Sequence, residues 1–159
     1  MNSVFVQAKK FNLPVELLIV EWNPPSDKPL LNEVLPQPED TPVSVKYVVV
    51  PKEIHDTYKF AKAMPLYQMI AKNVGIRRAS GEFVLCTNID ILFTDQCFEK
   101  LAQRDLEKGK FYRANRCDVP KEVMDHETHA DQSNGDKGNA QTAKTIRHIA
   151  VFELFSHTG

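Results

Sequence analysis

Two polar side chains follow an apolar run in this sequence, and their spacing is its first sign of chemistry. The run Glu82 to Ile89 has the pattern of a buried strand, yet Asn88 and Asp90 stand at its end. A carboxylate without a partner is costly to remove from water, so Asp90 either leaves the sheet or binds something. A carboxylate here suits Mg²⁺ or Mn²⁺, which completes its shell with water and phosphate oxygens. The alternative is that Asp90 only caps the turn that follows.

A second pair of polar residues ends another apolar run. Val15 to Trp22 is β-branched and apolar, and Glu21 and Asn23 stand at its end. In an open α/β sheet, ligands bind beyond the carboxyl ends of the strands. We therefore expect these groups to converge with Asn88 and Asp90 on one edge of the sheet, where a cation would hold a nucleotide diphosphate.

The helix predicted before the run Glu82 to Ile89 adds positive charge. Asn73 and Arg77 are four residues apart and share one helical face, and Arg78 follows directly. Arginine offers a planar fork that matches phosphate oxygens, so this helix end could neutralise a diphosphate at the same edge. The alternative is a solvated helix face.

The periodicity of apolar residues predicts the elements that position these groups. The expected elements are a helix near the start, strands Val15 to Trp22 and Val43 to Pro51, a helix from Leu66 to near Gly81, a strand Glu82 to Ile89, a helix from Thr94 or Asp95 to Gly109, and a strand Lys110 to Val119. The segment between Pro51 and Pro65 is expected to be a loop with at most a turn of helix. Strands that alternate with helices predict an α/β layered, Rossmann-like αβα fold with a mostly parallel sheet. We expect one domain over residues 1–159, with a mobile surface loop at 125–144.

Composition excludes several classes of protein. A formal net charge of -1 argues against a general nucleic-acid-binding surface, and no apolar run approaches the roughly 20 residues of a transmembrane segment. The start has no long apolar signal core, which favours a cytoplasmic protein. The three cysteines form no Cys-x-x-Cys pair, and His126 and His129 lack the spacing of a helical zinc motif.

The run MIAKNVGIRRASGEFVLCTNIDILF, Met69 to Phe93, resembles the central segment of family 2 type glycosyltransferases of the GT-A fold. In that family a helix end of the form Asn-x-Gly-x-x-x-Ala-x-Gly-Glu leads into a strand and an Asp-x-Asp-like metal motif. The matching residues here are Asn73, Gly75, Ala79, Gly81 and Glu82, followed by Asn88-Ile89-Asp90 at the metal motif. The stretches Val20 to Pro25 and Phe111 to Pro120 also resemble family segments, so the resemblance covers roughly Val4 to Pro120.

The resemblance implies a metal-dependent enzyme that transfers a sugar from a nucleotide-diphosphate donor to an acceptor hydroxyl of a glycan, lipid or protein. Asp90 would hold Mn²⁺ or Mg²⁺, and Asn88 would orient the ribose or a metal-bound water. Glu21, with Asn23 beside it, would contact the base, and Arg77 or Arg78, with Asn73, would help to hold the diphosphate.

This sequence departs from the family in two respects. The family's first strand and acceptor-binding half are missing, so we expect a GT-A-like domain that is partial at both ends, with its catalytic base outside this chain. Asn88 also replaces the first acid of the metal motif, which leaves Asp90 as the stronger metal ligand.

Two other functions remain open. One is a catalytically inactive nucleotide-binding or scaffold fragment of such an enzyme. The other is a nucleotidyltransferase, a class that can share this layered fold but whose early Gly-rich phosphate loop is absent here.

Overall fold

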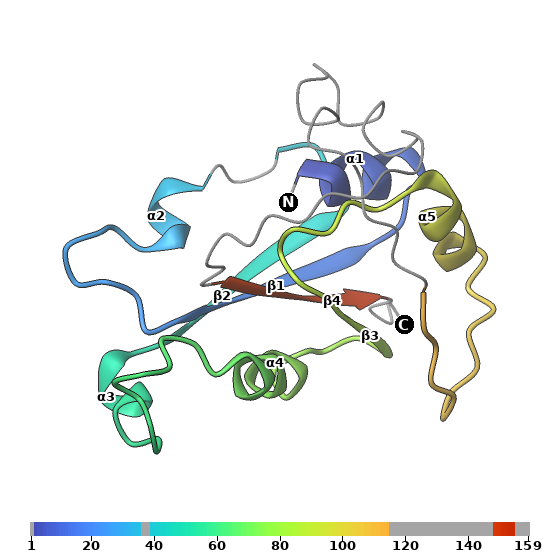
Figure 1. The fold of residues 1–159 in the computed structure, drawn as a ribbon. Helices are drawn as coiled ribbons and strands as arrows, with labels where there is room; N and C mark the ends of the chain where they lie inside the picture. The colour runs from blue at the N-terminus through green and yellow to red at the C-terminus, as the bar shows by residue number, and fades with distance from the viewer. Residues whose placement is uncertain (1, 36–38, 115–147, 155–159) are drawn as a thin grey trace, which may run out of the picture. The chain divides into compact units, whose positions relative to one another are not determined.

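The computed structural model describes residues 2–35, 39–114 and 148–154, and the chain divides into two compact units (Figure 1). The first comprises Met1–Leu13 and Leu92–Thr145 and is called the helical unit. The second comprises Pro14–Ile91 and Ile146–Gly159 and is called the sheet unit. All of the residues predicted to bind donor or metal belong to the sheet unit.

The sheet unit is built on a four-stranded sheet in the order β2-β1-β4-β3. Its strands are β1 (Val15–Trp22), β2 (Val43–Val50), β3 (Phe83–Cys86) and β4 (His148–Leu154). β1 and β2 are parallel, whereas β4 is antiparallel to both β1 and β3. The α/β class is as predicted, but the sheet is mixed rather than mostly parallel. The difference arises because an apolar run near the end of the sequence enters the sheet as a central, reversed strand.

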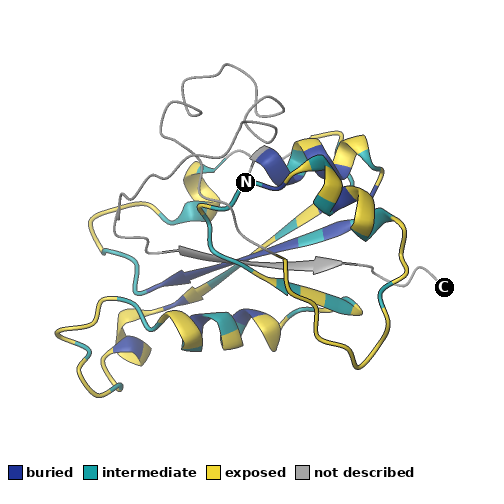
Figure 2. Cartoon of the chain, turned by 45° about the vertical axis from the view of Figure 1, so that its right-hand side comes forward, coloured by how far each residue is buried: buried dark blue, intermediate teal, exposed yellow. Residues whose placement is uncertain are grey.

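β1 is the core of the sheet unit. Leu17 to Val20 are completely buried, as expected of a strand with side chains covered on both faces. Leu18, Val20 and Trp22 alternate onto one face and pack with Ala71 of α4 (Gln68–Ile76). Figures 1 and 2 show α4 on the same side of the sheet as the short helix α3 (Lys52–His55).

Several predicted elements are shorter in the structure than in the sequence pattern. The helix expected from Leu66 to near Gly81 is α4, which ends at Ile76, and the strand expected over Glu82 to Ile89 is limited to β3. The segment after Pro51 forms the single turn of α3, as predicted, and α2 (Leu31–Val34) is another short helix. Apolar periodicity thus located these elements better than it located their ends.

The strand predicted at Lys110 to Val119 is wrong over its described part. Residues 110–114 form no strand, and residues 115–119 lie outside the described ranges. Phe111 is fully exposed and Tyr112 is largely exposed, so the apolar side chains that favoured a strand enter no core.

The helical unit contains α1 (Asn2–Lys10) and α5 (Asp95–Ala102). Thr94 caps α5 as predicted, its hydroxyl accepting the backbone N–H of Cys97. The Gln7 amide donates to the carbonyl of Phe93 at 3.2 Å and to Oδ1 of Asp95 at 2.8 Å, which ties α1 to the start of α5. α5 ends at Ala102 rather than near Gly109.

The predicted mobile loop at 125–144, with His126 and His129, lies outside the described residues. None of the helices in the described ranges combines the length and the apolar character that a bilayer-spanning segment requires.

Candidate functional site at the carboxyl edge of the sheet

β1 and β2 end side by side, with Trp22 opposite Val50. The backbone N–H of Asn23 then donates to the carbonyl of Val50 at 2.8 Å. Asn23 has a φ of 50°, in the left-handed region that asparagine tolerates better than most residues. The chain therefore turns away from the sheet immediately after β1, and Glu21 and Asn23 lie at the carboxyl edge, as predicted.

Glu21 is a buried carboxylate at this edge, only 4% exposed. Its Oε2 accepts the backbone N–H of Leu31 at 3.0 Å, at the first residue of α2. Because side chains alternate along a strand, Glu21 points to the face opposite that of Trp22 and α4. The hydrogen bond provides a polar partner to a charge that burial would otherwise destabilise.

His55 lies on the other face of the same edge and is 3% exposed. The indole N–H of Trp22 donates to its Nδ1 at 2.8 Å. An indole nitrogen can only donate, so Nδ1 must accept, and the neutral ring carries its proton on Nε2. Nε2 lies 3.0 Å from the carbonyl of Ala61 and donates to it. Both ring nitrogens are thus engaged, which makes His55 a structural residue here rather than a free base.

Tyr58 and Tyr67 complete an aromatic cluster with Trp22 and His55. Ring centroids in this cluster lie 5.0–6.2 Å apart in tilted and edge-on arrangements, the geometries that aromatic pairs prefer. The Tyr67 hydroxyl also donates to the carbonyl of Lys59. The cluster fixes the segment after β2 against the end of β1.

Sequence reasoning missed His55, because the segment after Pro51 was treated as a loop. A signal was present: His55 comes four residues after Pro51, the end of the second predicted strand, and in a parallel sheet that end lies beside the end of the first strand, where Trp22 stands. Two donor-capable ring residues brought to one edge were sufficient to predict a contact.

Asn88 lies two residues beyond the end of β3. In space it lies beside Gln68, the first residue of α4. The Gln68 side-chain amide donates to its Oδ1 at 2.9 Å. Asp90 follows and is exposed, and within the described ranges it has no hydrogen bond or ion pair. β3 runs in the same direction as β1, since both are antiparallel to β4. Asn88, just after β3, and Glu21, near the end of β1, therefore lie at the same edge of the sheet.

α4 runs in the opposite direction to β1, which separates its basic end from this edge. Its first residue, Gln68, contacts Asn88 at the carboxyl edge, whereas the backbone N–H of Ser80, just beyond its end, donates to Glu16 near the start of β1 at 3.4 Å. Arg77 and Arg78 therefore lie at the amino edge of the sheet.

Asn73 lies on the outer, exposed side of α4. The structure thus brings Glu21, Asn23 and Asn88 to one edge, with Asp90 just beyond, but does not bring Arg77, Arg78 or Asn73 to them. Helical spacing correctly placed Asn73 and Arg77 on one helix but could not indicate the direction in which that helix crosses the sheet.

The donor set fits a hard cation that keeps most of its water. No three His, Cys, Asp or Glu residues gather as a ligand group in the part of the chain that the structure describes. Asp90 would provide one carboxylate, and Asn88 Oδ1 retains a second lone pair beside its bond to Gln68. Mg²⁺ and Mn²⁺ accept such a sparse set when phosphate oxygens complete the shell.

Comparisons of the chain with protein-family models, with curated proteins and with solved structures found no match.

Proposed function

We propose that this chain is the donor-binding part of a metal-dependent glycosyltransferase that uses a nucleotide-diphosphate sugar. The observation that carries the proposal is Asp90, an exposed carboxylate just beyond β3 that has no partner among the described residues, at the edge where β1 ends with Glu21 and Trp22. The sequence resemblance around residues 69–93 supports the same assignment.

Each residue of this edge has a role in the proposal. Asp90 holds the cation, and Asn88, oriented by Gln68, positions the ribose or a water. Glu21 contacts the base while its Oε2 stays anchored on Leu31. A Mg²⁺ or Mn²⁺ ion held by Asp90 would supply positive charge to stabilise the departing diphosphate.

Arg77 and Arg78 are left out of the diphosphate site in this proposal, because they lie at the other edge of the sheet. Asn73 is left out because it faces outward. The acceptor, a glycan, lipid or protein hydroxyl, and the general base are not assigned to residues of this chain.

The test is a thermal-shift panel of UDP, GDP and their sugars with and without Mn²⁺, on the wild-type chain and on Asp90→Ala. A ligand that binds only the folded state stabilises it by about 2.7 kcal/mol at a hundredfold excess over its dissociation constant. We expect a shift for one nucleotide that requires the metal and disappears in Asp90→Ala.

Two matched variants make the test specific. Glu99→Ala removes an exposed acid from α5 of the helical unit, and Arg77→Ala removes a cation from the amino edge; both should keep the full shift. A metal-independent shift that survives Asp90→Ala would instead support a nucleotide-binding fragment without transferase chemistry. The absence of any shift in a folded sample would contradict the proposal.

A further inference from the structure

The surface formed by α3, the segment after it and α4 combines exposed apolar side chains with positive charge. Its apolar members, called here the outer apolar residues, are Ile54, Phe60, Met64, Met69 and Ile76. Phe60 is 64% exposed and Met69 is 69% exposed, unusually high for such large apolar side chains. Figure 2 shows mostly exposed residues along α3 and the segment that follows it.

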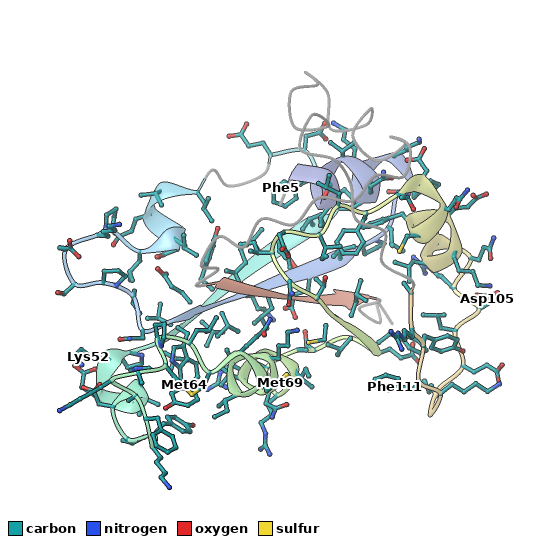
Figure 3. All side chains as sticks on the ribbon, in the orientation of Figure 1. Phe5, Lys52, Met64, Met69, Asp105 and Phe111 are labelled. Carbon is teal, nitrogen blue, oxygen red and sulfur yellow. The ribbon has the colours of Figure 1, made fainter. Side chains whose placement is uncertain are left out.

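These side chains share one side of the sheet unit. Ala71 and Gly75 are the buried residues of α4 and face the sheet. At 100° per residue, Met69 lies roughly 140° and Ile76 roughly 120° from the centre of that face, so both belong to the outer half of the helix. Figure 3 labels Met64 and Met69 on the α3–α4 side of the sheet. The outer apolar residues therefore belong to the layer that covers this face, on its outside.

The turn that contains Phe60 keeps its ring exposed to solvent. Phe60 has a φ of 68°, a left-handed conformation that is unfavourable for a bulky residue. The backbone N–H groups of Ala63 and Met64 both donate to its carbonyl at 2.9 Å, which fixes the turn. Lys59 Nζ lies 4.9 Å from the centre of the Phe60 ring, so a cation and an aromatic ring are presented together.

Positive charge is concentrated in the same segment. Residues 52–78 contain six Lys and Arg residues against two acids, in a chain with a formal net charge of -1. One of the acids, Asp56, is engaged by Lys52. Lys59, Lys62 and Lys72 then flank the outer apolar residues, and the balance of charge favours an anionic partner.

We propose that this surface docks on an anionic lipid bilayer. Phe60, Met64 and Met69 would enter the boundary between headgroups and acyl chains, while the flanking lysines would contact the lipid phosphates. A nucleic acid offers the same phosphates but no apolar phase for these side chains, so it accounts for the charge and leaves the exposed Phe and Met unexplained. The binding is peripheral, and it is independent of the donor site proposed above.

The test is co-sedimentation of the full chain with vesicles. Vesicles of phosphatidylcholine alone are compared with vesicles of equal parts phosphatidylcholine and phosphatidylserine, at low and at high salt. We expect binding to the anionic vesicles, which weakens as salt rises. Phe60→Asn, which suits the left-handed backbone, should weaken binding roughly tenfold. Lys59→Glu with Lys62→Glu should weaken it by more, since each lysine near the surface contributes roughly fivefold.

Matched controls separate this surface from general stickiness. Phe111→Asn removes a fully exposed ring from the helical unit, and Lys28→Glu with Lys110→Glu makes the same change of charge outside residues 52–78. Both controls should bind as the wild type does. The proposal is overturned if anionic vesicles do not bind, if the controls lose as much binding as the test variants, or if a single-stranded oligonucleotide competes fully while Phe60→Asn changes nothing.

Nucleotide-induced thermal shifts, measured on the same variants, distinguish the two proposals. Phe60→Asn should keep any such shift, and Asp90→Ala should keep vesicle binding.

Discussion

β1 has a glutamate near each end, and the two carboxylates are stabilised by different partners. Glu16, near the start, forms an ion pair with Lys46 of β2 and accepts the backbone N–H of Ser80. Glu21, at the end, accepts the backbone N–H of Leu31 and is buried. Glu21 lies five positions after Glu16, and because side chains alternate along a strand, an odd offset puts the two on opposite faces of the sheet.

The two edges of the sheet unit differ in whether their carboxylates are already paired with a cation. At the amino edge, Glu16 is paired with a cation, and α4 delivers Arg77 and Arg78 to the same edge. At the carboxyl edge, Glu21 accepts from a neutral peptide group, the backbone N–H of Leu31, and Asp90 has no partner in the described ranges. This contrast supports the proposed cation site at the carboxyl edge rather than at the amino edge.

The largest expected effect comes from breaking the carboxyl edge at Trp22. Trp22→Ala removes a buried side chain of the aromatic cluster and the donor to His55 Nδ1. We expect a loss of about 3–5 kcal/mol in the free energy of unfolding. Urea unfolding followed by circular dichroism measures it, because Trp22 is the only tryptophan and fluorescence would be lost.

Trp22→Phe isolates the hydrogen bond from the packing. It keeps most of the ring but leaves the buried Nδ1 of His55 without its donor, which should cost about 1–3 kcal/mol. If Trp22→Phe were as stable as the wild type, the Trp22–His55 bond would have no energetic role and the carboxyl edge would be held by packing alone.

The next effect tests the anchor of Glu21. Glu21→Ala leaves the partly buried N–H of Leu31 without an acceptor, and we expect a loss of about 1–3 kcal/mol in urea unfolding. Glu21→Gln keeps an acceptor oxygen and should lose less. Equal losses in the two variants would mean that the charge of Glu21, rather than its hydrogen bond, stabilises this edge.

The fold could be predicted where burial dictates the residue pattern. The strand Val15 to Trp22 has the predicted bounds, since its side chains are buried on both faces and leave no room for another assignment. The start of α5 was also predictable, because Thr94 is a common N-cap residue whose hydroxyl accepts a backbone N–H of the first turn. The prediction of a strand near Lys110 was wrong because Phe111 and Tyr112 are apolar but exposed. The polarity of single residues does not show whether they will be buried.

The candidate site was only partly predictable, for a reason of topology. Glu21 is the last residue but one of β1, and Asn88 follows the end of β3, so the rule for parallel strands was enough to bring them to one edge. Arg77 and Arg78 depend on the path of α4 across the sheet, which is set by contacts such as that of Ser80 with Glu16, far apart in sequence. The reversed central strand β4 was hidden for the same reason.

A smaller effect is expected at the amino edge. Glu16 is only 10% exposed but Lys46 is half exposed, so solvent screening at the lysine keeps this ion pair near the upper end of the range of about 0–1 kcal/mol for surface pairs. A double-mutant cycle of Glu16→Gln and Lys46→Met should give a coupling energy in that range that decreases at high salt. A coupling above the cost of Glu21→Ala would reverse the comparison and make the amino edge the more strongly held of the two.

The smallest expected effect is a change in the pKa of Asp56, in the segment that follows β2. Asp56 at the end of α3 accepts two hydrogen bonds from Lys52, at 2.8 and 2.6 Å, and these hold the pKa of its carboxyl below the usual value near 3.8. Because the folded pKa is the lower one, the pair stabilises the fold above the unfolded pKa, and this contribution is lost as pH falls through the folded pKa. The Asp56 side chain is exposed, so solvent screening keeps the contribution small.

Carboxyl titration by nuclear magnetic resonance should show the pKa of Asp56 rising in Lys52→Ala. Asp105 of the helical unit is the internal control, because a hydrogen bond from Lys100 lowers its pKa and Lys52→Ala leaves that bond intact. An unchanged Asp56 titration would show that Lys52 does not hold this carboxylate in solution. Lys52 would then add to the positive charge that α3 presents on the outer surface, and Lys52→Glu should weaken vesicle binding along with Lys59→Glu and Lys62→Glu.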